Sequence, residues 1–303
     1  MEAKRKGWAV LKLMTAMAMV GANVALGKVI IAEVSIFLFS ILRFAIAVLT
    51  LLPLVFLFDS RHWSLTRGEH ASLFLQAFFG VFVFHLCMLY GVQYTSAINA
   101  GILTSTLPAM VAIFSWLLLR EVLRGKIVLA IILAIVGTLI LNSQVNGSEQ
   151  SSAPLLGNSL ILIAVAGEAL YTIFAKKLSN RLSPLKMALA VNFLGFLLFL
   201  PLAWGEITLS NLLAVSAEMW GWMIYYSLTA SVISLVLWYS GVRDVPAQYA
   251  GLFTAMIPVA AVLVSILLLG ELMRWYHWVG GGVILASLWL GMPKRVKAMK
   301  TPN

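Results

Sequence analysis

Apolar runs long enough to cross a membrane recur along the whole chain, and they constrain the fold more than any other feature. The hydrocarbon core of a bilayer is about 30 Å thick, so a helix that spans it needs roughly 20 apolar residues. The chain is 62% hydrophobic and only 11% charged, with a mean hydropathy of +0.99, unlike a soluble domain. Its 303 residues have room for about ten such helices with short loops. We therefore expect an all-α membrane protein without a separate soluble domain.

Charged and turn-forming residues divide the apolar sequence into ten expected transmembrane helices. These cover residues 8–30, 35–58, 72–92, 98–119, 126–143, 155–175, 184–203, 219–241, 249–269 and 276–292. The N-terminus resembles a signal peptide, with basic residues before an apolar run. However, Lys12 interrupts that run, which continues to Ile31. We therefore expect an uncleaved first helix.

Positive charges are distributed unevenly between the loops. Seventeen Lys and Arg residues fall at the N-terminus, in alternate loops and in the tail, whereas the opposite loops hold only Lys28 and Arg274. By the positive-inside rule, both termini are cytoplasmic, residues 61–67 and 178–183 are internal, and residues 145–152 are external. The excess of 21 Lys and Arg over 11 Asp and Glu therefore indicates orientation in a cell inner membrane, and we expect no nucleic-acid partner.

The chain contains an internal repeat. Between residues 91–124 and 241–274, offset by 150, 13 of 34 positions are identical without a gap. At an offset of 148 the earlier parts correspond, with Ser35 over Ser183 and "LLPL" at 51–54 over "FLPL" at 199–202. Each unit holds five expected helices. Because five is odd, the second copy enters the membrane from the opposite side, as in inverted-repeat transporters. We expect one repeat at 1–145, a second at 153–293 and a basic cytoplasmic tail at 294–303.

Several motifs make the chain resemble the EamA-type members of the drug/metabolite transporter superfamily. The motifs are "GANVALGK", "LRFAIA", "AGILTSTLPAMVAIFSWLLLREVL" and "AGLFTAMIPVAAVLVSILLLGELM". The resemblance covers almost the whole chain and implies a ten-helix, two-repeat carrier that exports amino acids or other metabolites. Many members have Trp where this chain has Val20 and Glu168. The expected export direction rests on this resemblance alone.

Signatures of soluble enzymes are absent from the sequence. There is no P-loop and no dinucleotide fingerprint, and the four dispersed His and one Cys do not have metal-ligand spacing. The single Cys87 cannot form an intrachain disulfide. We therefore expect a protein that is not an enzyme, with no cofactor, no metal and no direct drive by ATP.

Glu168 is the full charge in the apolar run from Leu155 to Ala175, and charges at this depth usually face a cavity or a partner. The alternative is a structural carboxylate bonded to a neighbouring hydroxyl. Tyr171 and Thr172, three and four residues later, share its helix face. We predict that Glu168 and Tyr171 bind substrate and that Glu168 carries a proton.

His85 and Arg43 are two further ionisable residues within apolar runs. His85 is either a hydrogen-bonded structural residue or a ligand for substrate or a proton, since histidine titrates near neutral pH. Arg43 is either part of a structural ion pair or cavity-lining. Lys28 is near a helix end, where its long side chain can reach the interface. We include His85 among the predicted substrate and proton sites.

Other polar residues suggest where helices break or meet. Asn23 offers either a cavity amide or an interhelical hydrogen bond. Pro108 and Pro258 are predicted to interrupt two helices at matching depths, with Thr104 and Thr254 one turn earlier. Such breaks either line a cavity and allow the helices to open and close it, or they are kinks that only affect helix packing. We assign Asn23, Thr104 and Thr254 to the predicted substrate site.

Three further features are expected to be structural. An interfacial aromatic belt is predicted for Tyr90, Tyr225, Tyr226, Trp238 and Tyr239. Glu121 and Glu271 are expected at helix junctions, paired with Arg124 and Arg274. The small residues of 278–291 suit close packing or a homodimer.

These observations predict a secondary transporter that exports a small polar or zwitterionic metabolite, such as an amino acid, by alternating access. The expected site lies among helices 1, 3, 4, 6, 8 and 9, and the expected partners are the small-molecule substrate and membrane lipid. The alternatives are a proton-independent facilitator, an uptake carrier or a non-transporting membrane partner. Matched helix breaks in two repeats argue against the last, and an intramembrane enzyme would need a catalytic constellation.

Overall fold

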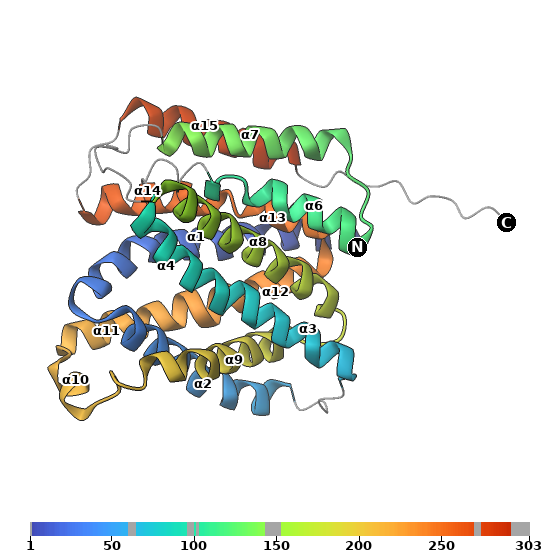
Figure 1. Ribbon diagram of the computed structural model, residues 1–303. Coiled ribbons are helices and arrows are strands. Elements are labelled where there is room, and N and C mark those ends of the chain that lie inside the picture. Colours follow the sequence, from blue (N-terminus) through green and yellow to red (C-terminus); the bar gives the residue numbers. More distant parts are fainter. Residues whose placement is uncertain are drawn as a thin grey trace.

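The computed structural model describes residues 2–59, 65–95, 100, 103–142, 153–269 and 274–291, and this part of the chain is helices and short connections (Figure 1). The helices are α1 (Glu2–Glu33), α2 (Ile36–Phe58), α3 (Arg67–Ala77), η1 (Phe78–Val83), α4 (Phe84–Tyr94), α6 (Leu107–Leu119), α7 (Gly125–Asn142), α8 (Pro154–Leu178), α9 (Pro184–Ala203), α10 (Leu209–Ala214), α11 (Ala217–Tyr226), η2 (Ser227–Ile233), α12 (Ser234–Asp244), α13 (Ala247–Phe253), α14 (Met256–Leu269) and α15 (Trp275–Gly291).

Seven helices in the described part are long and apolar enough to span a membrane. Two shorter apolar helices, Leu107–Leu119 and Gly125–Leu141, accompany them. The protein is therefore an all-helical, multi-pass membrane protein, as expected from the sequence. The count of ten spans and the inverted orientation of the second repeat stay predictions.

Two of the long helices contain a π-helical segment. The segment η1 joins α3 to α4, and η2 joins α11 to α12. Their first residues, Phe78 and Ser227, are 149 positions apart, close to the offset of the sequence repeat. A π-bulge is rare and widens the helix locally, and it is found frequently at functional sites. The two halves thus share an irregularity at equivalent positions.

Helix packing follows the same equivalence. The pair α2 and α9 packs along one side of the bundle, and the pair α7 and α15 along the other (Figure 1). Between them, α1 contacts α12 and α14, and the equivalent helix α8 contacts α4 and α6. Each of these contacts joins helices from different halves.

Glycines allow the closest of these approaches. A Cβ added to Gly91 would lie 2.7 Å from Cγ1 of Ile161, and one added to Gly241 would lie 2.6 Å from Cγ of Leu13. The offsets between Gly91 and Gly241 and between Leu13 and Ile161 are those of the repeat. Helix crossings with small residues at the contact are typical of membrane bundles.

Polar groups join the ends of α2 and α9. The Glu206 carboxylate, beyond the end of α9, accepts hydrogen bonds from Ser35 Oγ and from the Leu38 N–H at the start of α2, the latter at 3.0 Å. At the opposite end, Lys186 Nζ lies 3.1 Å from Oδ1 of Asp59, with both side chains largely buried. Each helix of the pair is therefore held at its start by a carboxylate that follows the other helix.

Glu121 has a different partner from the predicted one. Its carboxylate accepts hydrogen bonds from the N–H groups of Ala247 (3.0 Å) and Gln248 (3.4 Å) at the start of α13, and from the hydroxyl of Ser115. The predicted pairing with Arg124 is wrong, because a helix N-terminus with unpaired N–H groups attracts the carboxylate more strongly than an exposed guanidinium. Glu271 lies outside the described residues, and so does the side chain of Lys28.

Candidate functional site

Glu168 lies in the second half of α8, far from both helix ends. Protein atoms surround its carboxylate, yet the residue retains accessible surface. The Glu168 side chain is therefore enclosed by protein on most sides but not on all. Among the described residues, no hydrogen bond or ion pair reaches the carboxylate, and its electrostatic neighbours are the phenols of Tyr171 and Tyr239. The structural alternative was a carboxylate bonded to a nearby hydroxyl, and the described residues form no such bond.

A chain of buried hydrogen bonds lies beside Glu168 and joins three helices. The hydroxyls of Tyr171 on α8 and Tyr239 on α12 are 2.6 Å apart. Gln76 on α3 donates its side-chain amide to the Tyr239 hydroxyl at 3.0 Å. We call Gln76, Tyr171 and Tyr239 the tyrosine–glutamine cluster. Gly80 allows Tyr171 to sit there, because an added Cβ would lie 2.2 Å from the Cβ of Tyr171.

This cluster has unused hydrogen-bonding capacity. The bond between Tyr171 and Tyr239 uses one hydroxyl proton, so the other proton is available to the Glu168 carboxylate or to a ligand. The Oε1 atom of Gln76 is buried and without a partner in the described part. Amide orientation follows from the hydrogen-bond network, and either orientation leaves one atom of the amide unbonded. A buried group in this state requires an explanation, and a ligand or proton carrier next to it provides one.

Asn23 occupies the position in α1 that corresponds to Tyr171 in α8 at the 148-residue offset. Its amide donates to the carbonyl of Met19 (2.8 Å) and to the hydroxyl of Thr229 in η2 (3.0 Å). The residue therefore forms an interhelical hydrogen bond. Thr229 in turn corresponds to Gly80, which contacts Tyr171. Asn23 and Tyr171 thus meet the π segments of opposite halves at equivalent points.

His85 lies apart from Glu168, on α4. Its Nδ1 is 2.6 Å from the carbonyl oxygen of Val81, and its ring packs edge-on against Phe84 and Phe199. Arg43 on α2 is its electrostatic neighbour. The charged neighbour of His85 is therefore Arg43. Glu168, which was predicted to carry protons together with His85, is not its neighbour.

The chain leaves the helical path near both predicted prolines. Residues 105–106 form a turn before α6, which begins at Leu107 with Pro108 in its first turn. Thr254 and Ala255 form the equivalent turn between α13 and α14, ahead of Pro258. The hydroxyls of Thr104 and Thr254 donate to carbonyls of their own helices, at 2.9 Å and 2.6 Å. In the described part these threonines stabilise the breaks, and a role in substrate binding stays a prediction.

Sequence reasoning missed Gln76, Thr229 and the buried position of Tyr239. The predicted interfacial belt is wrong for Trp238 and Tyr239, which are 3% and 1% exposed. Their helix continues to Asp244 and packs against α1 and α9, so residues near its end are covered by protein. An amide such as Gln76 inside an apolar run was a usable signal, since such groups need a partner within the membrane.

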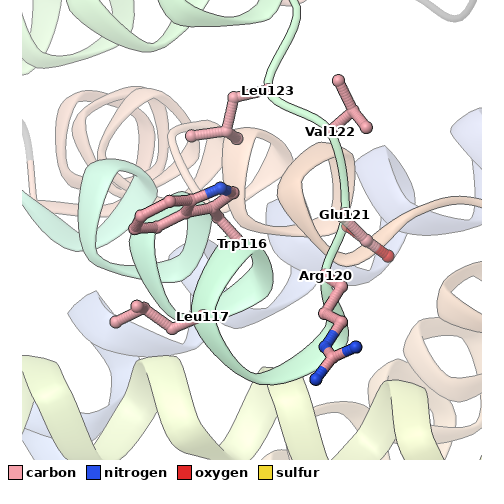
Figure 2. Close-up of a pocket in the computed structure, with 6 residues that line it drawn as sticks. All are labelled: Trp116, Leu117, Arg120, Glu121, Val122 and Leu123. Carbon is pink, nitrogen blue, oxygen red and sulfur yellow. The ribbon is translucent and has the colours of Figure 1, made fainter.

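A pocket of about 500 Å³ opens where α6 meets the linker to α7 (Figure 2). Its lining comprises Trp116, Leu117, Arg120, Glu121, Val122 and Leu123. Glu121 is already bonded to the start of α13, and the other polar side chain, Arg120, is exposed. This pocket is at the surface and shares no residue with the site around Glu168.

The fold and the buried polar groups together define a membrane transporter. Two helical halves make equivalent contacts across the bundle, and polar groups within the membrane mark the pathway of such proteins. The profile of the EamA-like transporter family matches residues 7–143 and again residues 155–292. The chain therefore belongs to this family and contains its domain twice.

The relatives agree with this assignment. The chain is 39% identical over 293 residues to the "Uncharacterized transporter YetK" of Bacillus subtilis, covering 96% of this chain and 89% of that protein. It is 26% identical over 254 residues to an "Uncharacterized transporter" of Archaeoglobus fulgidus, covering 84% and 87%. A solved structure titled "Crystal structure of protein" superposes with a TM-score of 0.77 at 15% identity, covering 93% of this chain and 95% of the other. That likeness shows the fold.

Proposed function

We propose that this transporter moves a small polar or zwitterionic metabolite, such as an amino acid, outward across the cell inner membrane by alternating access. The observation that carries the proposal is the Glu168 carboxylate, which lies deep in α8 without a hydrogen bond or ion pair from the described residues. An unpaired charge inside a membrane protein is costly. A cationic substrate group or a proton would relieve that cost when it binds.

The groups around Glu168 favour a substrate with N–H donors. Glu168 and the unbonded Oε1 atom of Gln76 offer acceptors, and one phenol of the tyrosine–glutamine cluster keeps a free proton. An ammonium group would fit this arrangement, because it has three donors and no acceptor. A proton could take the same place on the carboxylate in the other half of the cycle, so that substrate and proton exchange. We propose no cofactor and no catalytic reaction.

The equivalence of the two halves supports rocking as the mechanism. The turns at 105–106 and 254–255 and the segments η1 and η2 place irregular backbone at matching positions in each half. Broken or widened helices are tolerated in membranes where they line a cavity or are bonded again by neighbours. Each half could therefore adopt the conformation of the other, which would move the opening from one side to the other.

We further propose ten spanning helices in two inverted repeats, with both termini cytoplasmic, because the loop charges support that orientation.

A homodimer would use α15. Gly280 of this helix already contacts α7, but a Cβ added to Gly281 or Gly282 would meet no neighbouring helix within 4 Å in the described part. That part of the small-residue face is available to a second copy.

A metabolite screen followed by reconstitution tests the proposal. Compounds that raise the melting temperature of the purified protein would be assayed for counterflow in proteoliposomes. We expect Glu168→Gln to melt near the wild type and to lose at least tenfold of the flux. Glu218→Gln, which changes an exposed carboxylate in the first turn of α11, is the matched control. Normal flux in the Glu168→Gln protein would refute the proposal. Wild-type flux that does not respond to a proton gradient would indicate a proton-independent facilitator instead.

A further inference from the structure

Arg43 is a second charged residue inside a candidate span, and the described structure gives it no partner. It lies about two turns into α2, which spans Ile36–Phe58. Its guanidinium makes no hydrogen bond and no ion pair within the described residues, and its Nε atom is buried without a partner. Guanidinium groups remain charged at any physiological pH. Arg43 is therefore a positive charge that no side chain of the described part neutralises.

The surroundings of Arg43 are aromatic. Its Cζ lies 4.4 Å from the ring centroid of Phe44 and 5.9 Å from that of Tyr226 on α11. The imidazole of His85 is its electrostatic neighbour. Ring faces stabilise a cation but accept no hydrogen bond comparable to that of a carboxylate. The N–H donors of the guanidinium are therefore held in place and unused.

The fold itself does not require a charge at this position. At the 148-residue offset, Arg43 corresponds to Val191 in α9, which is 2% exposed. The offset is structurally supported because Ser35 and Ser183 cap the starts of α2 and α9 in the same way. Glu168 likewise corresponds to Val20. Arg43 and Glu168 lie in opposite halves and have opposite signs, and in both cases an apolar residue occupies the equivalent position of the other half.

We propose that Arg43 binds the carboxylate of the transported metabolite. This inference rests on the function proposed above and deepens it: the substrate carries a carboxylate as well as an amino group. A guanidinium presents paired N–H donors whose geometry matches the two oxygens of a carboxylate. The aromatic rings of Phe44 and Tyr226 would hold the guanidinium plane in position for that contact. Arg43 would then contact the carboxylate end of the substrate.

The test uses the purified full-length protein and the twenty proteinogenic amino acids, each paired with its C-terminal amide. The amide retains the amino group and side chain but has no charge at the α-carboxyl position. We expect at least one amino acid to stabilise the wild type against heat, with its amide at least tenfold weaker. Arg43→Gln should lower the affinity for that amino acid to the level of the amide and leave the amide unchanged. Glu168→Gln should weaken both compounds.

Controls separate binding from folding. Arg243→Gln changes an exposed arginine and should leave both affinities intact. Arg43→Gln should melt near the wild-type temperature without ligand, because in the described part the guanidinium has aromatic contacts but no hydrogen bond or ion pair to lose. If the Gln variant does not fold, Arg43→Lys replaces it. This variant keeps the positive charge but not the paired N–H donors, so its affinity for the amino acid should be at least threefold lower than that of the wild type.

Two outcomes would overturn the inference. In the first, an Arg43→Gln protein binds the amino acid with wild-type affinity. In the second, amides or amines bind and are transported while no carboxylate is, which would remove the role of Arg43 but leave the proposed function intact. If none of these compounds is bound or transported, the proposed function fails, and the role of Arg43 fails with it.

Discussion

Removing the Tyr239 hydroxyl should disconnect the three helices that meet beside Glu168. Tyr239→Phe removes the acceptor of the Gln76 amide and the partner of the Tyr171 hydroxyl. Hydrogen bonds between membrane helices are worth about 0.6 kcal/mol each on average, which sets a lower estimate of roughly 1 kcal/mol for two. A buried group left unsatisfied costs about 1–3 kcal/mol. Because Gln76 already has one unbonded atom and would lose its other bond, we expect about 2 kcal/mol.

A double-mutant cycle tests whether the losses at Tyr239 and Gln76 are coupled. Gln76→Met replaces the amide by an unbranched apolar side chain of similar length. The double variant removes the Gln76 amide that Tyr239→Phe leaves unsatisfied, so it should be at least 1 kcal/mol more stable than the sum of the two single changes predicts. Unfolding would be followed in detergent by denaturant titration, with Tyr225→Phe, an exposed tyrosine, as control. Additive effects, or a Tyr239→Phe protein as stable as the wild type, would refute the described bonding.

The remaining predictions concern the helix breaks, the buried ion pair and the topology. Pro108→Ala and Pro258→Ala should reduce counterflow without lowering the melting temperature, since both prolines lie in the first turn of their helices, where either proline or alanine is tolerated; Pro201→Ala in α9 is the control, and normal counterflow in both variants would show that the breaks only affect packing. Lys186→Met should destabilise the protein more than Arg181→Met in denaturant titration, because it removes a largely buried ion pair with Asp59, whereas Arg181 is an exposed partner of Glu69 worth under about 1 kcal/mol; equal losses would contradict this. In a Cys87→Ala background, an impermeant thiol reagent added outside should label a cysteine at Gln150 and not one at Asn180, and efficient labelling at Asn180 would invert the proposed topology.

The sequence was sufficient to predict the fold class because membrane helices are set by local composition. Apolar runs bounded by charges gave α2 and α9 close to their observed limits, Ile36–Phe58 and Pro184–Ala203. The repeat offset also predicted which helices are equivalent. The first helix is longer than expected, from Glu2 to Glu33, because charged residues at its ends can extend beyond the hydrocarbon without breaking the helix.

The candidate site was only partly predictable. Glu168 was found because it is a full charge within an apolar run, and Tyr171 because it shares that face of the helix. The bond between Gln76 and Tyr239 joins residues 163 positions apart, and no local pattern indicates such a pair. Glu121 was assigned to the nearest arginine, whereas its partners at 247–248 are 126 and 127 positions away. Long-range polar contacts depend on how the halves pack, and periodicity in one helix carries no information about that.

Proton movement during transport tests the role of Glu168 most directly. Proteoliposomes would enclose a pH-sensitive dye and receive a substrate found in the thermal screen. The account predicts that substrate addition changes the luminal pH for the wild type and for Glu218→Gln, and that Glu168→Gln produces no such change even though it folds. A Glu168→Gln protein that moves protons with the substrate as the wild type does would contradict the account.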